Sequence, residues 1–406
     1  MQALVVGAGP GGLAVSRELK ARGVEHVVLE RGEGPGQSWA GVYDSLLHHT
    51  GKHLSALPGR RLPRSAPLFV PAADFLAYLR DYAATFDLPI RTSCAAVRAT
   101  RTDGRWRVET PAGPLEARAL VMATGIMSNP YTPEIAGRED FGGTVRHSIQ
   151  YLRPAPFVGR RVLVVGAGNS SGEIAPELAH AGAHVTVAIR SGANVVPRTV
   201  AGVPIQYVAW AALKLPVPVR RVVVGGFARV SRAVRGAPPF PPGSGPLLGE
   251  VPIIGFKLVD AIRGGRVRLR GALERFTASG VRFRDGTEEP FDDVILATGF
   301  RAALGPLEGL VTRDERGFAR RRGRVISAEQ PDLYFVGHHY DGTGGLYNIS
   351  VDAPTVARHI AGGSEVSAGR GGARPCDRFG GHGVCKDGGT RARIERTSLG
   401  MQPSQP

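Results

Sequence analysis

Short apolar runs alternate with amphipathic stretches through the first half of the chain. The first group has apolar runs at residues 3–6 and 27–30, with a helical pattern at 11–22 between them. The second has apolar runs at 162–165 and 185–189 around a helical pattern at 170–181. Apolar strands joined by a crossover helix are typical of parallel sheets, so we expect two βαβ units in an α/β fold.

Weaker patterns complete the expected elements. Residues 72–86 place Phe75, Leu79 and Tyr82 on one helical face, and a last helix is expected at 351–360. Further strands are expected at 106–110, 119–122, 267–269, 281–283, 294–296 and 333–336. The proline-rich residues 237–246 predict a loop, and the Gly-, Arg- and Ser-rich residues 363–406 predict a disordered tail.

The net charge of +16 raises the question of a nucleic-acid partner. The chain has 51 Lys and Arg against 35 Asp and Glu, interleaved along most of its length. No helix-turn-helix, zinc-finger or RNA-binding signature accompanies them. We therefore expect no nucleic-acid partner, and we expect basic clefts to attract phosphorylated cofactors.

The pattern also lacks membrane and disulfide signatures. The best candidate for a membrane span, residues 207–227, is interrupted by Lys214, Pro216, Pro218, Arg220 and Arg221. Because an apolar strand follows Met1 almost directly, we expect no signal peptide. Three cysteines, Cys94, Cys376 and Cys385, give neither a disulfide framework nor a zinc site. We expect a cytoplasmic protein without a transmembrane segment.

A glycine-rich turn follows the first apolar run. The turn contains Gly7, Gly9, Gly11 and Gly12 and opens the first predicted helix. Glycines at this spacing let the backbone approach a pyrophosphate, and the helix N-terminus offers free N–H groups to the phosphates. Glu30 ends the next strand, where a carboxylate can accept hydrogen bonds from ribose hydroxyls.

A second turn of this kind follows the strand at 162–165. It is formed by Gly166, Gly168, Asn169, Ser170 and Ser171, with a serine in place of the third glycine. The next strand ends in Arg190 and Ser191 instead of an acid, and these side chains can bind a ribose 2′-phosphate. This favours NADPH over NADH; the alternative is that Arg190 is only a solvated residue at the strand end.

The two turns predict FAD at the first site and NADPH at the second. Ala123-Thr124-Gly125 and residues 297–299 each end an apolar strand in a turn of small residues, where the chain can cross between domains. The expected organisation is an FAD-binding domain in two parts, 1–152 and 296–362. An inserted NADPH-binding domain at 153–295 carries a substrate-channel segment.

The segment between the turns carries a family resemblance. Phe141, Gly143, His147 and Tyr151 fit the fingerprint of flavin-containing monooxygenases, the class B flavoprotein monooxygenases. Similarity to the YUCCA-type subgroup lies in Trp39 and in residues 43–46, 57–58, 196–198 and 296–300. The resemblance covers about residues 1–360 and implies a Rossmann-like FAD domain with an inserted Rossmann-like NADPH domain. It also implies that His147 holds the linker, whereas the residue alone would suggest a general base.

Other candidates follow from the same resemblance. Arg31, Trp39 and Gly337 join the expected FAD-binding residues. His49 occupies a position where relatives place a flavin-facing Asn or His, so it either donates a hydrogen bond near the flavin or is a packed histidine. Asn348 is expected to touch the isoalloxazine ring. His338 and His339 are adjacent on an extended segment and point in opposite directions, so no metal site is expected.

The resemblance implies a monooxygenase reaction on a small organic substrate. NADPH reduces FAD, and reduced flavin captures O2 as a C4a-hydroperoxide that transfers one oxygen atom to an amine, a sulfide or a 2-oxo acid. Three alternatives remain open: an NADPH oxidase, a flavin-dependent reductase and a non-catalytic flavoprotein binding partner. The sequence identifies neither the substrate nor the oligomeric state, and it leaves a homodimer open.

Overall fold

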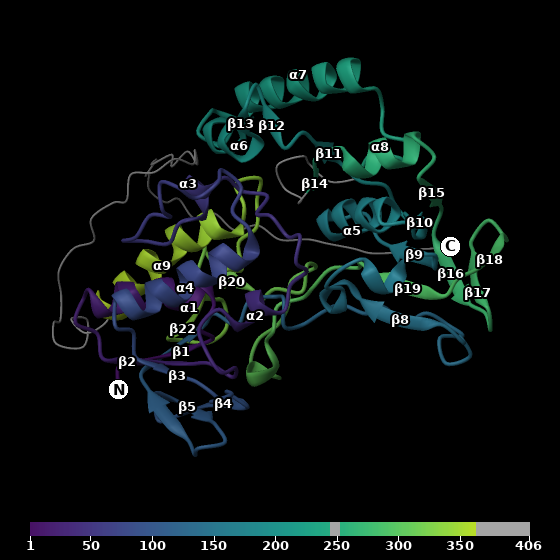
Figure 1. Cartoon of the computed structure of the whole chain (residues 1–406). Helices are drawn as coiled ribbons and strands as arrows, with labels where there is room; N and C mark the ends of the chain where they lie inside the picture. The colour runs from purple at the N-terminus through teal and green to yellow at the C-terminus, as the bar shows by residue number, and fades with distance from the viewer. Residues whose placement is uncertain (244–251, 363–406) are drawn as a thin grey trace, which may run out of the picture. The chain divides into compact units, whose positions relative to one another are not determined.

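The two βαβ units lie in two separate sheets (Figure 1). The computed structural model describes residues 1–243 and 252–362. The first sheet contains, in spatial order, β20 (Arg321–Arg322), β21 (Ile326–Ser327), β22 (Leu333–Phe335), β7 (Ala119–Met122), β1 (Ala3–Val6), β2 (His26–Leu29) and β3 (Ile90–Arg91). The second contains β15 (Val267–Arg270), β10 (His184–Ala188), β9 (Arg161–Val165), β19 (Asp293–Leu296) and β8 (Thr144–His147).

Parallel pairing dominates both sheets. From β22 to β3 every neighbouring pair in the first sheet is parallel, and so is every pair in the second. All four residues of β1 are buried, as expected for a central strand covered on both faces. The α/β class and the two βαβ units, each in a parallel sheet, are therefore confirmed. The expected domain boundary at residue 152 stays a prediction. Strand β8 precedes this residue in the chain and yet belongs to the second sheet.

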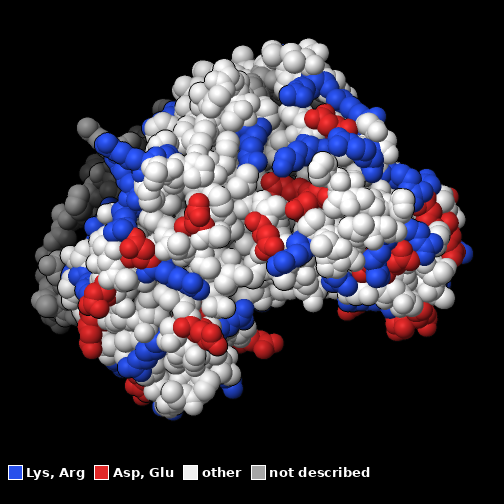
Figure 2. All heavy atoms as spheres, in the orientation of Figure 1, with Lys and Arg blue, Asp and Glu red and all other residues white. Residues whose placement is uncertain are grey.

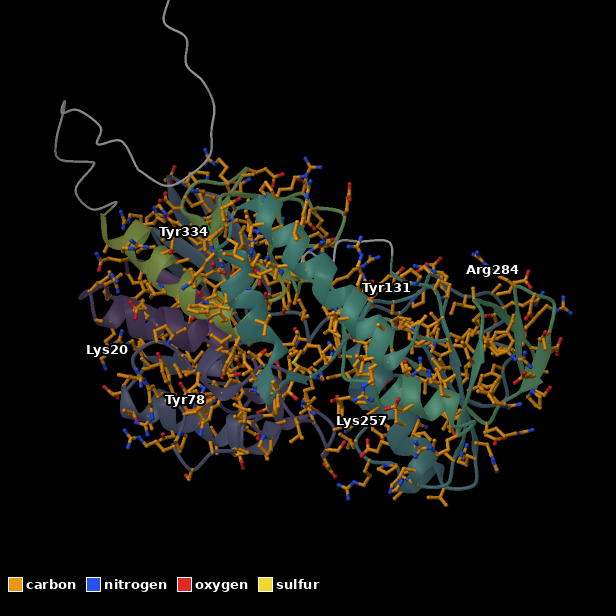
Figure 3. All side chains as sticks on the ribbon, turned by 90° about the horizontal axis from the view of Figure 1, so that it is seen from above. Lys20, Tyr78, Tyr131, Lys257, Arg284 and Tyr334 are labelled. Carbon is orange, nitrogen blue, oxygen red and sulfur yellow. The ribbon has the colours of Figure 1, made fainter. Side chains whose placement is uncertain are left out.

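Helices cover the sheets and position the glycine turns. The helices that accompany the first sheet are α1 (Pro10–Lys20), α2 (Gln37–Ala40), α3 (Lys52–Ser55), α4 (Ala72–Thr85) and α9 (Gly345–Gly362). Those of the second are α5 (Asn169–His180) and α8 (Lys257–Arg263). Tyr78 of α4, marked in Figure 3, ties the loop before α4 to the core, because its hydroxyl donates to the carbonyl of Arg60 at 2.7 Å.

Helix α9 begins earlier than the sequence pattern indicates. The expected start was residue 351, but the helix begins at Gly345. Its first turns contain Gly345, Asn348 and Ser350, which have modest or low helix propensity, so local pattern gives no signal there. Tertiary contacts of Asn348, described below, hold this segment in helical form.

The sequence pattern predicts one strand of each three-stranded small sheet, at 106–110 and 281–283, but neither their neighbouring strands nor an inserted helix pair. One three-stranded sheet contains β4 (Arg98–Thr102), β5 (Arg105–Glu109) and β6 (Leu115–Ala117), and another contains β16 (Leu273–Phe276), β17 (Gly280–Phe283) and β18 (Glu288–Pro290). Two further sheets have two strands each: β11 (Val195–Val196) pairs with β14 (Ile253–Ile254), and β12 (Thr199–Val200) pairs with β13 (Val203–Pro204). The inserted helices are α6 (Ile205–Leu213) and α7 (Val217–Arg235). Short 3₁₀ turns occur at Ser148–Gln150, Ala155–Phe157 and Gly305–Leu307.

Two observations bear on the expected partners. None of the helices in the described part of the chain is long and apolar enough to cross a membrane. Figure 2 shows Lys and Arg intermingled with Asp and Glu over the visible face. The predicted tail at 363–406 and the end of the predicted loop, 244–246, lie outside the described residues.

Candidate functional site

A cavity of ≈ 710 Å³ opens where strands β1, β2, β7 and β22 end. Carboxyl ends of parallel strands meet at one edge of a sheet, which is where doubly wound folds bind ligands. The expected FAD-binding residues that line this cavity are Gly7, Gly9, Gly11, Glu30, Arg31, Trp39, Ala123, Thr124, Gly125 and Gly337. The structure thus brings together residues that are far apart in the sequence.

Gly12 is the expected residue that does not line the cavity. A Cβ at Gly12 would lie 1.8 Å from the carbonyl oxygen of Gly7, so this position serves the close packing of α1 against β1. Gly9 behaves differently, because a Cβ there would meet no protein atom within 4 Å. The space beside Gly9 belongs to the cavity, as a pyrophosphate cradle requires.

Glu30 has its carboxylate fixed at the end of β2. Its Oε2 accepts a hydrogen bond from the amide of Ala8, and its Oε1 accepts one from the amide of Gly32, both at 2.8 Å. The side chain is buried but lines the cavity. Each oxygen keeps a further lone pair, so the carboxylate can also accept hydrogen bonds from ribose hydroxyls.

The second glycine turn repeats this geometry at the start of α5. A Cβ on Gly168 would meet nothing within 4 Å, whereas one on Gly166 would lie 2.3 Å from the carbonyl oxygen of Ala297. Asn169 fixes the turn through its Oδ1, which accepts from the amide of Ile254 at 2.8 Å. Ser170 is half-buried, and Ser171 is fully buried where the first turn has Gly12.

Arg190 and Ser191 lie exposed just beyond the end of β10. Among the described residues, Arg190 has no hydrogen-bond or ion-pair partner. A guanidinium left free at this strand end is available to an incoming phosphate.

A second cavity, of ≈ 510 Å³, adjoins the first. The two cavities share four lining residues: His49, Thr50, Tyr340 and Gly345. Asn169 of the second glycine turn lines the second cavity, and α6 and α7 supply much of its apolar lining. A ligand bound at the second turn therefore has a path to the first cavity past these four shared residues.

His49 lies at this junction as a half-buried, neutral imidazole. Its Nδ1 is 3.8 Å from Oε1 of Glu173, too far for a hydrogen bond, and Glu173 in turn accepts a hydrogen bond from the hydroxyl of Tyr43 at 2.5 Å. Burial lowers the pKa of His49, and the charge of Glu173 only partly opposes this. The neighbouring His48 packs between Trp39 and Phe75, and burial lowers its pKa to about 3.

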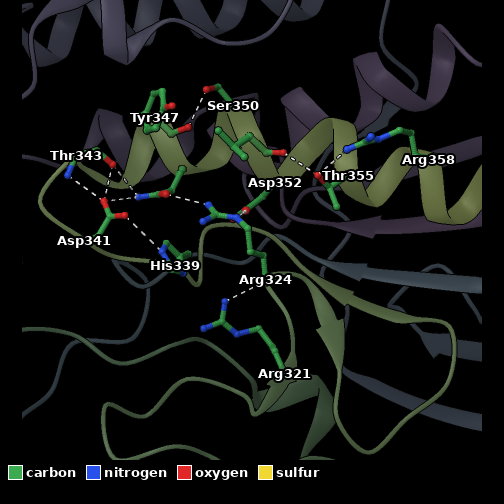
Figure 4. Close-up of polar contacts among 12 residues, drawn as sticks. Arg321, Arg324, His339, Asp341, Thr343, Tyr347, Ser350, Asp352, Thr355 and Arg358 are labelled. Carbon is green, nitrogen blue, oxygen red and sulfur yellow. Dashed lines mark hydrogen bonds and ion pairs between the residues drawn. The ribbon is translucent and has the colours of Figure 1, made fainter. Parts of the chain in front are cut away.

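The structure corrects the expectation for Asn348, which does not line the flavin-side cavity. Its Oδ1 accepts from Arg324 at 2.9 Å, and its Nδ2 donates to Asp341 and to the carbonyl of Gly344, both at 3.0 Å. Figure 4 labels two of these partners, Arg324 and Asp341. Arg324 also binds the buried carboxylate of Asp352. Both ends of the Asn348 amide are therefore occupied, and α9 presents Gly345, Leu346 and Ile349 to the cavity instead.

The fingerprint residues Phe141, Gly143, His147 and Tyr151 lie at and around β8, where the chain passes from the first sheet into the second. Nε2 of His147 donates to the carbonyl of Gly299 at 3.0 Å, and its Nδ1 accepts from the amide of Ile149 at 3.2 Å. A Cβ at Gly143 would lie 2.4 Å from the ring of Phe141, and Tyr151 donates to Glu177 at 2.8 Å. Both ring nitrogens of His147 are thus engaged in linker contacts, in agreement with a structural role.

The histidines near the C-terminal strand do not form a metal centre. Within residues 1–243 and 252–362, no group of three or more His, Cys, Asp or Glu is arranged to hold a metal ion. Burial lowers the pKa of His338 to about 3, while Nε2 of His339 lies 3.4 Å from Oδ2 of Asp341.

Several cavity residues carried no signal in the sequence. Tyr340 was not expected at the junction, nor were Met127, Asn129 and Arg313 in the flavin-side cavity. They come from loops whose path depends on the packing of both sheets. The pairing of residues 129–131 with 299–301 is one example, with the amide of Tyr131 donating to Gly299 at 2.9 Å.

Comparisons with known proteins show what the whole chain is similar to. Residues 4–201 match the family model described as pyridine nucleotide-disulphide oxidoreductase. The chain is 36% identical to indole-3-pyruvate monooxygenase YUCCA1 of Oryza sativa subsp. japonica, over 88% of this chain and 91% of the relative. It is 33% identical to a probable indole-3-pyruvate monooxygenase YUCCA1 of Arabidopsis thaliana, over 74% and 75%. A flavin-containing monooxygenase from Stenotrophomonas maltophilia superimposes with a TM-score of 0.72 at 26% identity, over 89% and 98%.

Proposed function

The chain belongs to the flavin-containing monooxygenase family, in its YUCCA-like branch, and on this premise we propose the reaction that its site performs. The protein is an oxidoreductase whose cofactors are FAD and NADPH. In the proposed reaction it inserts one oxygen atom from O2 into a small organic substrate, an amine, a sulfide or a 2-oxo acid. The names of the plant relatives, which specify indole-3-pyruvate, support a substrate with a large apolar part.

In this proposal the two glycine turns hold the two cofactors. Gly7, Gly9 and Gly11 receive the FAD pyrophosphate, and Glu30 binds the ribose. Gly166 and Gly168 receive the NADPH pyrophosphate, with Arg190 and Ser191 at the 2′-phosphate. The corresponding domains are 1–152 with 296–362, and 153–295.

The observation that carries the proposal is the junction of the two cavities. When bound, the flavin would supply hydride acceptance from NADPH and activation of O2. The chain's own part is to bring nucleotide, substrate and flavin together at His49, Thr50 and Tyr340. The apolar lining from α6 and α7 excludes water, which would otherwise release peroxide.

Rapid mixing tests the proposal directly. We expect the FAD-loaded protein, reduced with NADPH and mixed with O2, to show an absorbance band of a flavin C4a adduct that persists while NADP+ is bound. The control is the same protein reduced with dithionite in the absence of NADP+, in which the band should decay faster. Reoxidation without any adduct band in either case would instead identify a reductase.

Nucleotide preference gives a second expected result. Arg190→Ala should raise KM for NADPH roughly tenfold to a hundredfold, because a charge-assisted phosphate contact contributes about 1.5–3 kcal/mol. KM for NADH should change little, since NADH lacks the 2′-phosphate. Arg284→Ala is the matched control, because Arg284 is equally exposed but follows β17, which belongs to a different sheet from β10. Equal effects of Arg190→Ala on both nucleotides would contradict the assignment.

A further inference from the structure

Helix α7 has a row of valines on its surface. Val222 and Val234 are each 76% exposed, Val230 is 62% exposed and Val219 is 48% exposed. With Gly226 they follow one another at steps of three or four residues, so they form one face of the helix, the valine face. Figure 1 draws α7 beside α6, at the margin of the described residues. Single exposed valines are common on protein surfaces, but a continuous apolar face calls for a partner.

The second cavity does not account for this face. Val224 and Ser231 of α7 line that cavity. On a helix with 3.6 residues per turn, these two positions lie about half a turn around the axis from Val222. A surface helix usually buries its apolar side and exposes its charged side, whereas α7 has apolar residues on both sides. The valine face therefore requires an explanation of its own.

The charge of the helix restricts what can cover the valine face. The arginines of α7 are Arg220, Arg221, Arg229, Arg232 and Arg235, and the sequence between Glu177 and Glu250 contains no Asp or Glu. Arg221 and Arg229 are exposed, and among the described residues neither guanidinium has a hydrogen-bond or ion-pair partner. A partner that suits both features offers apolar groups and negative charges side by side.

A second copy of this helix does not meet that requirement. Two valine faces packed against each other would bring the arginines of both helices together, with no carboxylate on either helix. An anionic lipid surface does meet it, because acyl chains lie directly beneath negatively charged headgroups. Long arginine side chains can reach the headgroups while the neighbouring valines lie deeper.

We propose that α7 is a peripheral membrane-binding helix that lies along an anionic lipid surface, with its valine face in the boundary between headgroups and acyl chains. This mode of binding needs no helix of membrane-spanning length. Because α7 also lines the second cavity, bound lipid would lie next to the wall of that cavity. The inference goes beyond the proposed function and does not depend on it, since vesicle binding requires neither NADPH nor O2.

Vesicle sedimentation tests the proposal on the full, FAD-loaded chain. The protein is mixed with vesicles of phosphatidylcholine alone or with about 30% phosphatidylserine, and we expect at least about tenfold tighter binding to the anionic vesicles. Added NaCl should weaken this binding, because salt screens the attraction between arginines and headgroups.

Valine substitutions separate insertion of the helix from simple charge attraction. The triple variant Val222→Thr, Val230→Thr, Val234→Thr keeps the charge and the β-branched shape, and it should bind anionic vesicles about tenfold more weakly. Its flavin content and Tm should stay close to wild type, because the three side chains are exposed. The matched control is Val97→Thr with Val158→Thr, since these valines are 63% and 58% exposed outside α7; it should bind like the wild type.

Arginine substitutions test the electrostatic part. Arg221→Gln with Arg229→Gln should weaken binding to the anionic vesicles about tenfold or more and leave binding to pure phosphatidylcholine unchanged. Arg98→Gln with Arg284→Gln removes the same charge from exposed positions outside α7. This control should have a much smaller effect, which measures the contribution of net charge alone.

Each alternative occupant has its own result. Failure to bind either kind of vesicle, or a triple valine variant that binds like the wild type, would overturn the membrane-binding helix. Weaker binding only in the arginine variant would identify a general anion-binding surface instead. A wild-type dimer in light scattering that becomes a monomer in the valine variant, with unchanged vesicle binding, would assign the face to a second copy. A C4a adduct in rapid mixing without vesicle binding leaves the reaction standing and removes only this inference.

Discussion

Gly9→Ala should purify as a colourless protein without bound FAD. The space beside Gly9 contains no protein atom within 4 Å of an added Cβ, and that space is part of the flavin-side cavity. The new methyl group would therefore occupy the place of the pyrophosphate without disturbing the packing of the protein. We expect an almost complete loss of the flavin absorbance per protein molecule, together with a far-UV circular dichroism spectrum like that of the wild type.

The second glycine turn provides the matched control. Gly168 has the same open surroundings in its own turn, and it does not line the flavin-side cavity. Gly168→Ala should therefore keep its yellow colour and lose rapid reduction by NADPH, while dithionite still reduces the flavin. Full flavin occupancy in Gly9→Ala would sink the assignment of the first turn to FAD.

The sequence predicts the cofactor turns well because they depend on local geometry. Strands at 3–6 and 119–122 appear with the predicted bounds, and helix α4 ends one residue before the predicted position. Gly7 and Gly9 come together because a strand, a tight turn and a helix N-terminus are consecutive in the chain, and Glu30 joins them because β2 pairs with β1. A spacing rule on neighbouring residues is enough to find such a site.

The residues around the second cavity and the position of Asn348 could not be predicted from local spacing in the same way. Helix α6 lines the second cavity, and its Tyr207 and Trp210 bind residues more than 130 positions away in the chain. The family resemblance places Asn348 at the flavin, yet Arg324 and Asp341 hold its amide inside the protein. In both cases the position depends on distant contacts, which no local pattern encodes.

His49→Ala should uncouple NADPH oxidation from product formation. His49 lines both cavities, and its Nδ1 is buried without a hydrogen-bond partner among the described residues. Burial lowers its pKa, so the imidazole is neutral at pH 7 and carries one N–H that can donate to the flavin–oxygen adduct or to bound NADP+. Loss of a hydrogen bond of about 1–3 kcal/mol would speed decay of the adduct roughly tenfold to a hundredfold.

Three measurements on His49→Ala decide its role: flavin occupancy, the rate of flavin reduction by NADPH, and the yield of hydrogen peroxide. We expect the first two to stay close to wild type, whereas peroxide replaces oxygenated product. His49→Asn should restore part of the coupling, because an amide can also donate a hydrogen bond at this position. The control is His48→Ala, which removes a ring packed against Trp39 and Phe75 and should lower flavin occupancy and Tm without changing the peroxide yield per NADPH oxidised. If His49→Ala instead behaves like His48→Ala, with weakened flavin binding and an unchanged peroxide yield, His49 is a packing residue.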